Sequence, residues 1–219
     1  MGSDFAVQLC VIALVIYSTS LHEMAHAFTA HWLGDPTPGR HGRLTFNPLP
    51  HLSPVWTAII LPAVFYLTGG GLFCLAYTPV NPSRLRRPLR DYALLSLAGP
   101  VANFLFAAAL IGLLWVPGVW RSRLEDPNYL MLILPWAAFW GVVLGVFNLL
   151  PIPPLDGYGV IRGLLPLGLR QQTDAFARGG MVTMVIAMMV GSVALRAAAP
   201  ALFLVLDRLL PGPLPLLGG

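Results

Sequence analysis

Residues 92–120, YALLSLAGPVANFLFAAALIGLLWVPGVW, contain no charged side chain. Residues 127–155 also contain no charged side chain. Residues 44–83 contain no Asp, Glu, Lys or Arg, and their one histidine is His51. A helix needs about 20 apolar residues to cross a bilayer, so each run is long enough. Only 10% of the 219 residues are charged, against roughly 25% in ordinary soluble proteins. The sequence therefore predicts an all-α polytopic membrane protein with about four to six transmembrane helices.

The expected organisation is a single membrane-embedded domain over residues 1–219, with a core at 5–166 and C-terminal helices at 176–217. The apolar runs predict helices over 5–33, 92–117, 129–150 and 176–195. Prolines cut residues 197–217, which could form a short span or lie at the interface. Between the first two core helices we expect a re-entrant segment with a short strand at 43–47, because apolar and polar residues alternate there.

All 13 basic residues are arginines, and they are spread over short loops rather than along one helix face. This pattern is typical of cytoplasmic loops of membrane proteins and does not favour a nucleic-acid partner. The expected surroundings are the lipid bilayer, in a multi-pass arrangement in a prokaryotic plasma membrane. The sequence leaves the oligomeric state open.

The end of the first helix carries His22-Glu23-Met24-Ala25-His26. At about 100° per residue, His22 and His26 lie about 40° apart on one helix face, so both imidazoles can bind one zinc ion. Glu23 lies beside them, where it can take a proton from an attacking water. Ionisable groups within a span are costly and usually functional. The motif predicts a zinc-dependent hydrolase.

A catalytic zinc usually has three protein ligands, so a third must come from elsewhere. His31 is disfavoured because it points away from the first two histidines, and Glu125 because it lies in a polar loop. His41 and His51 follow the first helix and stay open by spacing alone. Asp156 is the strongest candidate because it follows an apolar run and a proline-rich break. A turn-forming Asp-Gly pair is the alternative reading of Asp156.

The sequence resembles the site-2 proteases, which are intramembrane zinc metallopeptidases, over residues 17–166. The resemblance is carried by HEMAH (22–26), GDPT (34–37), GRLTFNP (42–48), PVNP (79–82), AGPVAN (98–103) and FNLLPIPPLDG (147–157). It implies that His22, His26 and Asp156 bind one Zn²⁺ per chain and that Glu23 is the general base. It also implies that Asn148 lies near the substrate backbone. The chain resembles a compact member, without a PDZ or regulatory domain.

The topology of residues 55–77 follows from the ligands. If this stretch were a full span, His26 and Asp156 would be separated by much of the roughly 30 Å hydrocarbon core. A hairpin turning at Gly69–Gly71 brings both ligands to the same side. It also gathers nine arginines on that side against three on the other, with Arg208 omitted. We therefore expect the active site toward the cytoplasm.

The expected reaction is hydrolysis of peptide bonds within or near transmembrane segments of membrane-protein substrates. Arg43, Thr45 and Asn47 could contact an extended substrate by strand addition, although ordinary loop packing explains them equally well. Asn103 could line the wall of the substrate cavity. The alternative function is a membrane metal transporter or sensor that uses the same ligands. A transport path should offer ionisable groups along the spans, whereas here they gather at one depth.

Overall fold

The computed structural model describes residues 2–52, 78–116, 129–179 and 181–210. Within these ranges the secondary structure is helical, without a strand. Helices long and apolar enough to cross a membrane are α1 (Gly2–Trp32), α4 (Pro88–Leu114), α6 (Tyr129–Asn148) and α9 (Met181–Leu209). Four such helices in the described part confirm the prediction of an all-α polytopic membrane protein.

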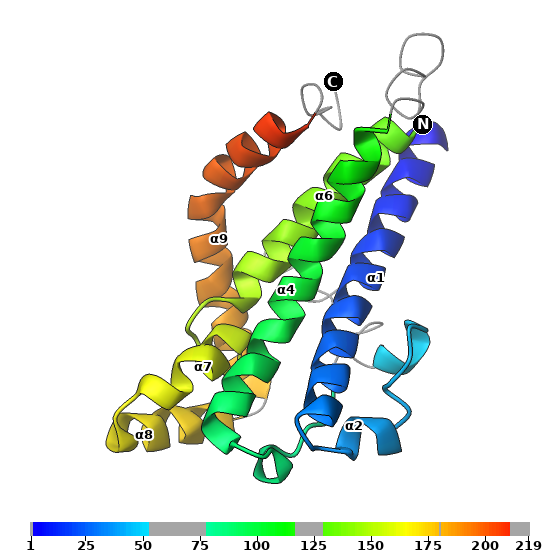
Figure 1. The fold of residues 1–219 in the computed structure, drawn as a ribbon. Coiled ribbons are helices and arrows are strands. Elements are labelled where there is room, and N and C mark those ends of the chain that lie inside the picture. The colour runs from blue at the N-terminus through cyan, green and yellow to red at the C-terminus, as the bar shows by residue number, and fades with distance from the viewer. Residues whose placement is uncertain (1, 53–77, 117–128, 180, 211–219) are drawn as a thin grey trace.

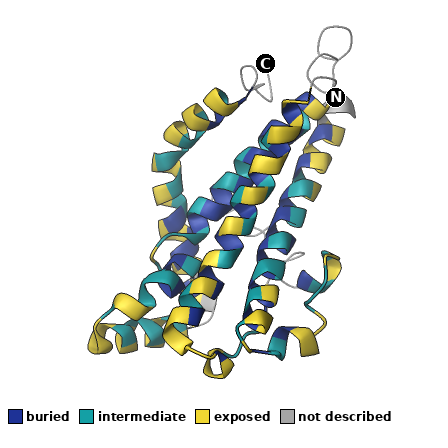
Figure 2. Ribbon diagram, viewed as in Figure 1, coloured by how far each residue is buried: buried dark blue, intermediate teal, exposed yellow. Residues whose placement is uncertain are grey.

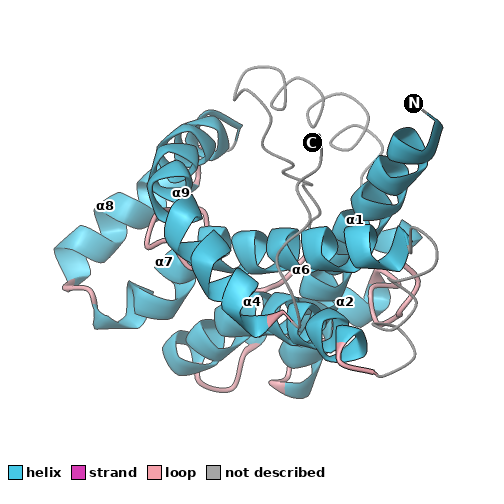
Figure 3. Cartoon of the chain, turned by 90° about the horizontal axis from the view of Figure 1, so that it is seen from above, coloured by secondary structure: helices cyan, strands magenta, loops and turns pink. Residues whose placement is uncertain are grey.

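Helices α1, α4 and α6 pack against one another, and α9 packs against α6 (Figures 1 and 3). Small residues let these helices approach closely: Ala107 of α4 and Ala137 and Ala138 of α6 are at most 1% exposed. Large apolar residues such as Leu105 are exposed instead, and exposed positions recur along the outer faces of these helices (Figure 2). Apolar outer faces are those that lipid would cover, so the burial pattern suits a helix group in a bilayer.

Helix α1 ends on the side of the molecule where α4 begins (Figure 1). The backbone N–H of Arg86 donates a hydrogen bond to the carbonyl of Leu33 over 3.3 Å, so the two helix ends are adjacent. The two chain segments that flank residues 53–77 therefore lie together, which is the arrangement that the ligand argument requires. Residues 53–77 lie outside the described residues, and the re-entrant hairpin at 55–77 stays a prediction.

Short helices cap the same end of the helix group (Figure 1). They are α2 (Thr37–Arg40), η1 (Leu49–His51), η3 (Pro82–Arg84), α7 (Asp156–Ile161), η5 (Arg162–Leu164) and α8 (Leu167–Ala177). Because α6 ends at this side too, the connection from α6 to α7 stays there. The end of α1 and the start of α7 can therefore meet.

The predicted strand at 43–47 is wrong, because residues 44–46 form bends and Arg43 and Asn47 have no regular structure. The hydroxyl of Thr45 accepts a hydrogen bond from the N–H of Asn47, and the side-chain oxygen of Asn47 accepts one from the N–H of Leu49. Such local side-chain bonds satisfy the backbone in turns and compete with a strand ladder. The alternation of apolar and polar residues alone did not reveal them.

Helix α9 continues through Arg196 and Pro200 to Leu209, so the expected break after residue 195 does not occur. The helix bends in its second half (Figure 1). A proline inside a helix removes one hydrogen bond and bends it. Ending the helix in an apolar medium would leave several backbone groups unsatisfied, so the bend is the cheaper solution. Residues 176 and 177, where the sequence predicts this helix to begin, belong instead to the separate helix α8 (Leu167–Ala177), and α9 begins at Met181.

Candidate metal centre

Helix α1 carries His22, Glu23 and His26 in its last three turns. His22 and His26 lie about 15 and 9 Å before the helix end at 1.5 Å per residue, within the apolar candidate span Phe5–Trp32. All three are buried, at 5%, 9% and 7% exposure. Their imidazoles meet edge to face, and the two Nε2 atoms lie 3.0 Å apart. His22 and His26 therefore lie on one face of α1, as their spacing predicts.

Asp156 is the first residue of α7, directly after the proline-rich break. The two glycines that follow it fix the position of α7. A side-chain carbon at Gly157 would collide with the carbonyl of Leu149, and one at Gly159 would collide with the hydroxyl of Ser96 on α4. Because no side chain intervenes, α7 packs directly against α4 and against the end of α6.

A polar cluster also ties α7 to α8. The guanidinium of Arg162 donates two hydrogen bonds to the carboxylate of Asp174, over 2.7 and 2.6 Å. The hydroxyl of Tyr158 donates to the same carboxylate over 2.6 Å. These bonds lower the pKa of Asp174, with the Arg162 hydrogen bond as the largest cause. Through Tyr158, this cluster fixes α7, the helix that carries Asp156, to α8.

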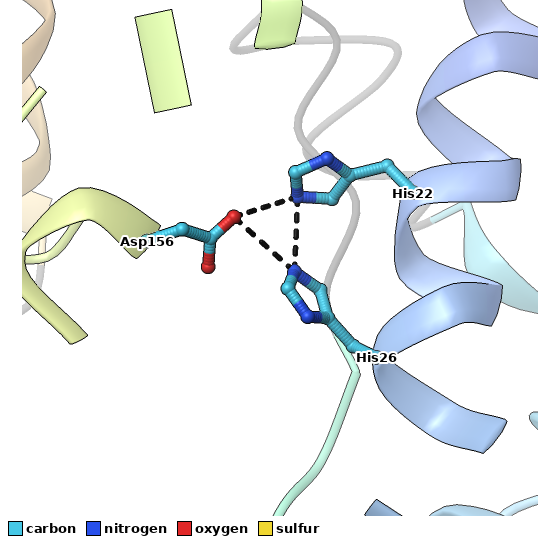
Figure 4. A group of neighbouring side chains, drawn as sticks. All are labelled: His22, His26 and Asp156. Atoms are coloured by element: carbon cyan, nitrogen blue, oxygen red, sulfur yellow. Dashed lines mark hydrogen bonds and ion pairs between the residues drawn. The ribbon is translucent and has the colours of Figure 1, made fainter. Parts of the chain in front are cut away.

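The three ligand atoms converge between α1 and α7 (Figure 4). Oδ2 of Asp156 lies 3.0 Å from Nε2 of His22 and 3.3 Å from Nε2 of His26. Burial by itself would raise the pKa of the Asp156 carboxyl, but the neighbouring imidazoles of His26 and His22 bring it well below its ordinary value. The group thus offers two imidazole nitrogens and an ionised carboxylate oxygen.

The far nitrogen of each imidazole has a partner on α4. Nδ1 of His26 donates a hydrogen bond to the carbonyl of Leu95 over 2.8 Å. Nδ1 of His22 lies 3.1 Å from the amide of Asn103. Imidazoles that bind a metal usually have their other nitrogen held in this way, which fixes the ring.

Three observations show that these residues fit a metal ion. Oδ2 of Asp156 is buried without a well-formed hydrogen bond. Gly99 of α4 leaves space beside the imidazoles, since a Cβ there would lie 2.5 Å from Nε2 of His26 and 2.6 Å from Nε2 of His22. Two imidazoles and one carboxylate are a known ligand set for catalytic zinc. The donor atoms and the space at Gly99 both suit one small cation.

The other histidines lie outside this group. His31 is exposed at the end of α1. His41 is exposed and its Nδ1 bonds to the carbonyl of Thr37, whereas His51 is buried and its Nε2 bonds to the carbonyl of Thr45. Among the described residues, only His22, His26 and Asp156 form a group of possible metal ligands. Glu125 lies outside the described residues.

The residues predicted to contact substrate fall into two places. Asn148 is the last residue of α6, where its amide donates to the carbonyl of Leu144 over 2.9 Å. Arg43 donates to the carbonyl of Pro50, so Arg43, Thr45 and Asn47 all form bonds within their own loop. A substrate role for these residues and for Asn103 stays a prediction.

Sequence reasoning missed two residues at the site. Ser18 donates a hydrogen bond to Asn103 over 3.1 Å, and the backbone carbonyl of Leu95 holds His26. A signal for Ser18 exists in the sequence, because it precedes His22 by four residues and therefore lies on the same face of the helix. Leu95 leaves no signal, because it acts through its main chain.

A buried pair of histidines, an aspartate and an adjacent glutamate among membrane-spanning helices are the features of a membrane-embedded metallopeptidase. The comparisons agree: the profile of peptidase family M50 matches residues 118–192. A Bacillus subtilis protein named YwhC, described as a candidate zinc metalloprotease, is 37% identical over 180 residues, covering 80% of this chain and 78% of the relative. The chain belongs to the M50 family, the site-2 protease family.

Rip2 of Mycolicibacterium smegmatis, which carries the same description, is 36% identical over 162 residues. Rip2 of Mycobacterium tuberculosis H37Rv is 35% identical over 157 residues. These alignments cover 73% and 69% of this chain but only 59% and 56% of the relatives. No solved structure matches significantly. The protein is thus a multi-pass membrane metalloprotease by family.

Proposed function

We propose that this chain hydrolyses peptide bonds within or next to the transmembrane segments of membrane proteins. The observation that carries the proposal is the meeting of His22, His26 and Asp156 inside the helix group, at a depth that the apolar part of α1 would place in the bilayer. Residues 1–219 would then act as one membrane-embedded peptidase domain.

His22 and His26 through Nε2, and Asp156 through its carboxylate, would hold one zinc ion per chain. When bound, zinc supplies Lewis-acid chemistry, because it polarises a carbonyl oxygen and makes water acidic enough to attack near neutral pH. Asp156 also neutralises part of the ion's charge. The partners on α4 keep both imidazoles aimed at the same point.

Glu23 is the general base in this proposal. It follows His22 directly on α1 and is buried at 9% exposure, so bulk water does not surround its carboxylate. In the ionised form it takes a proton from the attacking water. It then gives the proton to the leaving amine when the peptide bond breaks.

A transmembrane substrate must unwind near the cut, because helical carbonyls are engaged in hydrogen bonds. We propose that Asn148 holds the unwound substrate backbone at the end of α6. Contacts from Arg43, Thr45 and Asn47 are also proposed, as side-chain contacts rather than strand addition. Their loop lies on the side of the molecule where α1 ends.

We further propose that this side faces the cytoplasm and that the protein resides in the plasma membrane of a prokaryote. Among the described residues, nine arginines belong to the segments at this end: Arg40, Arg43, Arg84, Arg86, Arg87, Arg90, Arg162, Arg170 and Arg178. Basic residues in short loops favour the cytoplasmic side. The active site would then open toward the cytoplasm.

Metal analysis combined with a cleavage assay tests the function. The purified full chain is analysed for zinc and incubated with a panel of single-span peptides in detergent or vesicles. We expect about one zinc per chain, cleavage in or near the apolar segment, loss of cleavage with a chelator and recovery with added zinc. A transporter or sensor would bind zinc but leave every peptide intact, and that result would overturn the proposal.

A further inference from the structure

His22 differs from His26 in what holds its far nitrogen. To present Nε2 to a metal, each imidazole must carry its proton on Nδ1. His26 has no choice, because Nδ1 faces the carbonyl of Leu95, which can only accept a hydrogen bond. His22 faces an amide, which can donate through its nitrogen or accept through its oxygen.

With Nδ2 of Asn103 toward Nδ1 of His22, the amide donates and the ring must carry its proton on Nε2. That proton would then lie on the atom that faces Asp156 and His26. Ser18 completes this arrangement by donating to Oδ1 of Asn103. In this state His22 is not ready to bind a metal.

Rotating the Asn103 amide by half a turn exchanges Oδ1 and Nδ2. This reverses the direction of its hydrogen bonds to His22 and Ser18 without changing the shape of the side chain. Oδ1 then accepts from Nδ1–H of His22, and Nδ2 donates to the hydroxyl oxygen of Ser18. The proton of the hydroxyl becomes free to point elsewhere. We infer that Asn103, held by Ser18, is a positioning residue that fixes the metal-binding tautomer of His22 in this reversed orientation.

The surroundings make this relay difficult to replace. Ser18 is fully buried and Asn103 is 1% exposed, so bulk water cannot substitute for the amide. Gly141 of α6 lies on the third side, since a Cβ there would lie 3.7 Å from the hydroxyl of Ser18 and 3.5 Å from the backbone carbonyl oxygen of Asn103. The relay therefore sits where α1, α4 and α6 meet. This position favours a role in the metal site over substrate contact for Asn103.

The inference rests on the proposed function, because it assumes that Nε2 of His22 binds the metal. Its test is the zinc dissociation constant of the full chain, measured by competition with a chelator. Asn103→Asp is the decisive variant. An ionised carboxylate can accept a hydrogen bond from a protonated Nδ1 of His22, but it cannot donate one to an unprotonated Nδ1. We expect Asn103→Asp to bind zinc within about tenfold of the wild type, and Asn103→Leu to bind about 10–100-fold more weakly.

Thr19→Val is the matched control and should leave zinc affinity unchanged, because in the described part of the chain the buried Thr19 hydroxyl bonds to the carbonyl of Val15 within α1 and not to the metal-site residues. Thermal unfolding of the metal-free variants checks that each is folded. If Asn103→Asp loses zinc as Asn103→Leu does, or if Asn103→Leu binds like the wild type, the inference is wrong. His22→Ala distinguishes failure of this inference from failure of the proposed function. Unchanged zinc binding in that variant would overturn the proposed metal site itself.

Discussion

The carboxylate of Asp35 accepts a hydrogen bond from the backbone N–H of Asn81 over 2.6 Å. Asp35 follows α1 and Asn81 precedes α4, so this bond joins the two chain segments that flank residues 53–77. The N–H and hydroxyl of Thr37 donate to the other carboxylate oxygen. Three residues before Asn81 in the chain, the hydroxyl of Thr78 donates a hydrogen bond to the carbonyl of Glu23 over 3.0 Å. One buried carboxylate thus anchors the loop next to the candidate base.

Replacing Asp35 by Asn should destabilise this junction. The amide nitrogen of the new side chain would be a donor, and it would face either the N–H of Asn81 or the N–H and hydroxyl of Thr37, which are donors themselves. The resulting unsatisfied buried groups cost about 1–3 kcal/mol. Thermal unfolding in detergent should show a lower midpoint for Asp35→Asn, whereas Ser83→Ala, in the same loop but exposed, should change it little. Equal midpoints for Asp35→Asn and the wild type would contradict the anchoring role.

The pH dependence of this effect has a definite sign. Burial would raise the pKa of the Asp35 carboxyl, but the hydrogen bonds from Thr37 and Asn81, with the nearby Arg84, bring it below 3.8. A lowered pKa stabilises the fold above the unfolded pKa and loses that effect as the pH falls through the folded pKa. We expect the stability difference between wild type and Asp35→Asn to be full above about pH 5 and to shrink at lower pH.

Glu23→Gln should abolish cleavage and leave zinc at about one per chain. The amide keeps the shape of the side chain but cannot accept the proton, and general-base catalysis contributes about 10²–10⁴-fold. The measurement is peptide cleavage alongside metal content. Cleavage at more than a few per cent of the wild-type rate would remove Glu23 from the base role.

Asp156→Ala should lower zinc affinity and cleavage together, because it removes one of three ligands. His31→Ala and Glu125→Ala are the matched controls, and both should retain zinc and cleavage. Chelator competition and the cleavage assay measure the two effects. Release of zinc by Glu125→Ala, with Asp156→Ala unaffected, would show that the third ligand is misassigned.

Gly99→Ala should disrupt zinc binding without a change in any ligand. The added Cβ would lie 2.5–2.6 Å from Nε2 of both histidines, so the imidazoles must move apart or the metal position is filled. Gly112→Ala, on the same helix, meets nothing within 4 Å. It should keep zinc and gain up to about 1 kcal/mol of stability from helix propensity. Full zinc binding by Gly99→Ala would contradict the described geometry.

Cysteine labelling tests the topology. Cys10 is exposed on α1, so Cys10 and Cys74 are first replaced. Single cysteines at Ser53 and Ser83 should then react with a membrane-impermeant thiol reagent from the cytoplasmic side, and one at Ser122 only from the opposite side. Labelling of Ser53 and Ser83 from opposite sides would show that residues 55–77 cross the membrane.

The sequence by itself determined the membrane-spanning helices and the first half of the site. Long charge-free runs have few alternatives in a bilayer, where an unpaired backbone is too costly. The spacing of His22 and His26 fixes their common face through helix geometry alone. Local patterns failed at residues 43–47, where short-range hydrogen bonds to side chains form turns instead of a strand.

Only the tertiary structure decided which distant groups join that helix face. Spacing left His41 and His51 open beside Asp156, and the packing of α7 against α4 through Gly159 brings Asp156 to the histidines. The same packing places Asn103 and the carbonyl of Leu95 behind the two imidazoles. These contacts join residues far apart in the chain, and their distances depend on how whole helices pack. The spacing of residues within one helix carries no information about that packing.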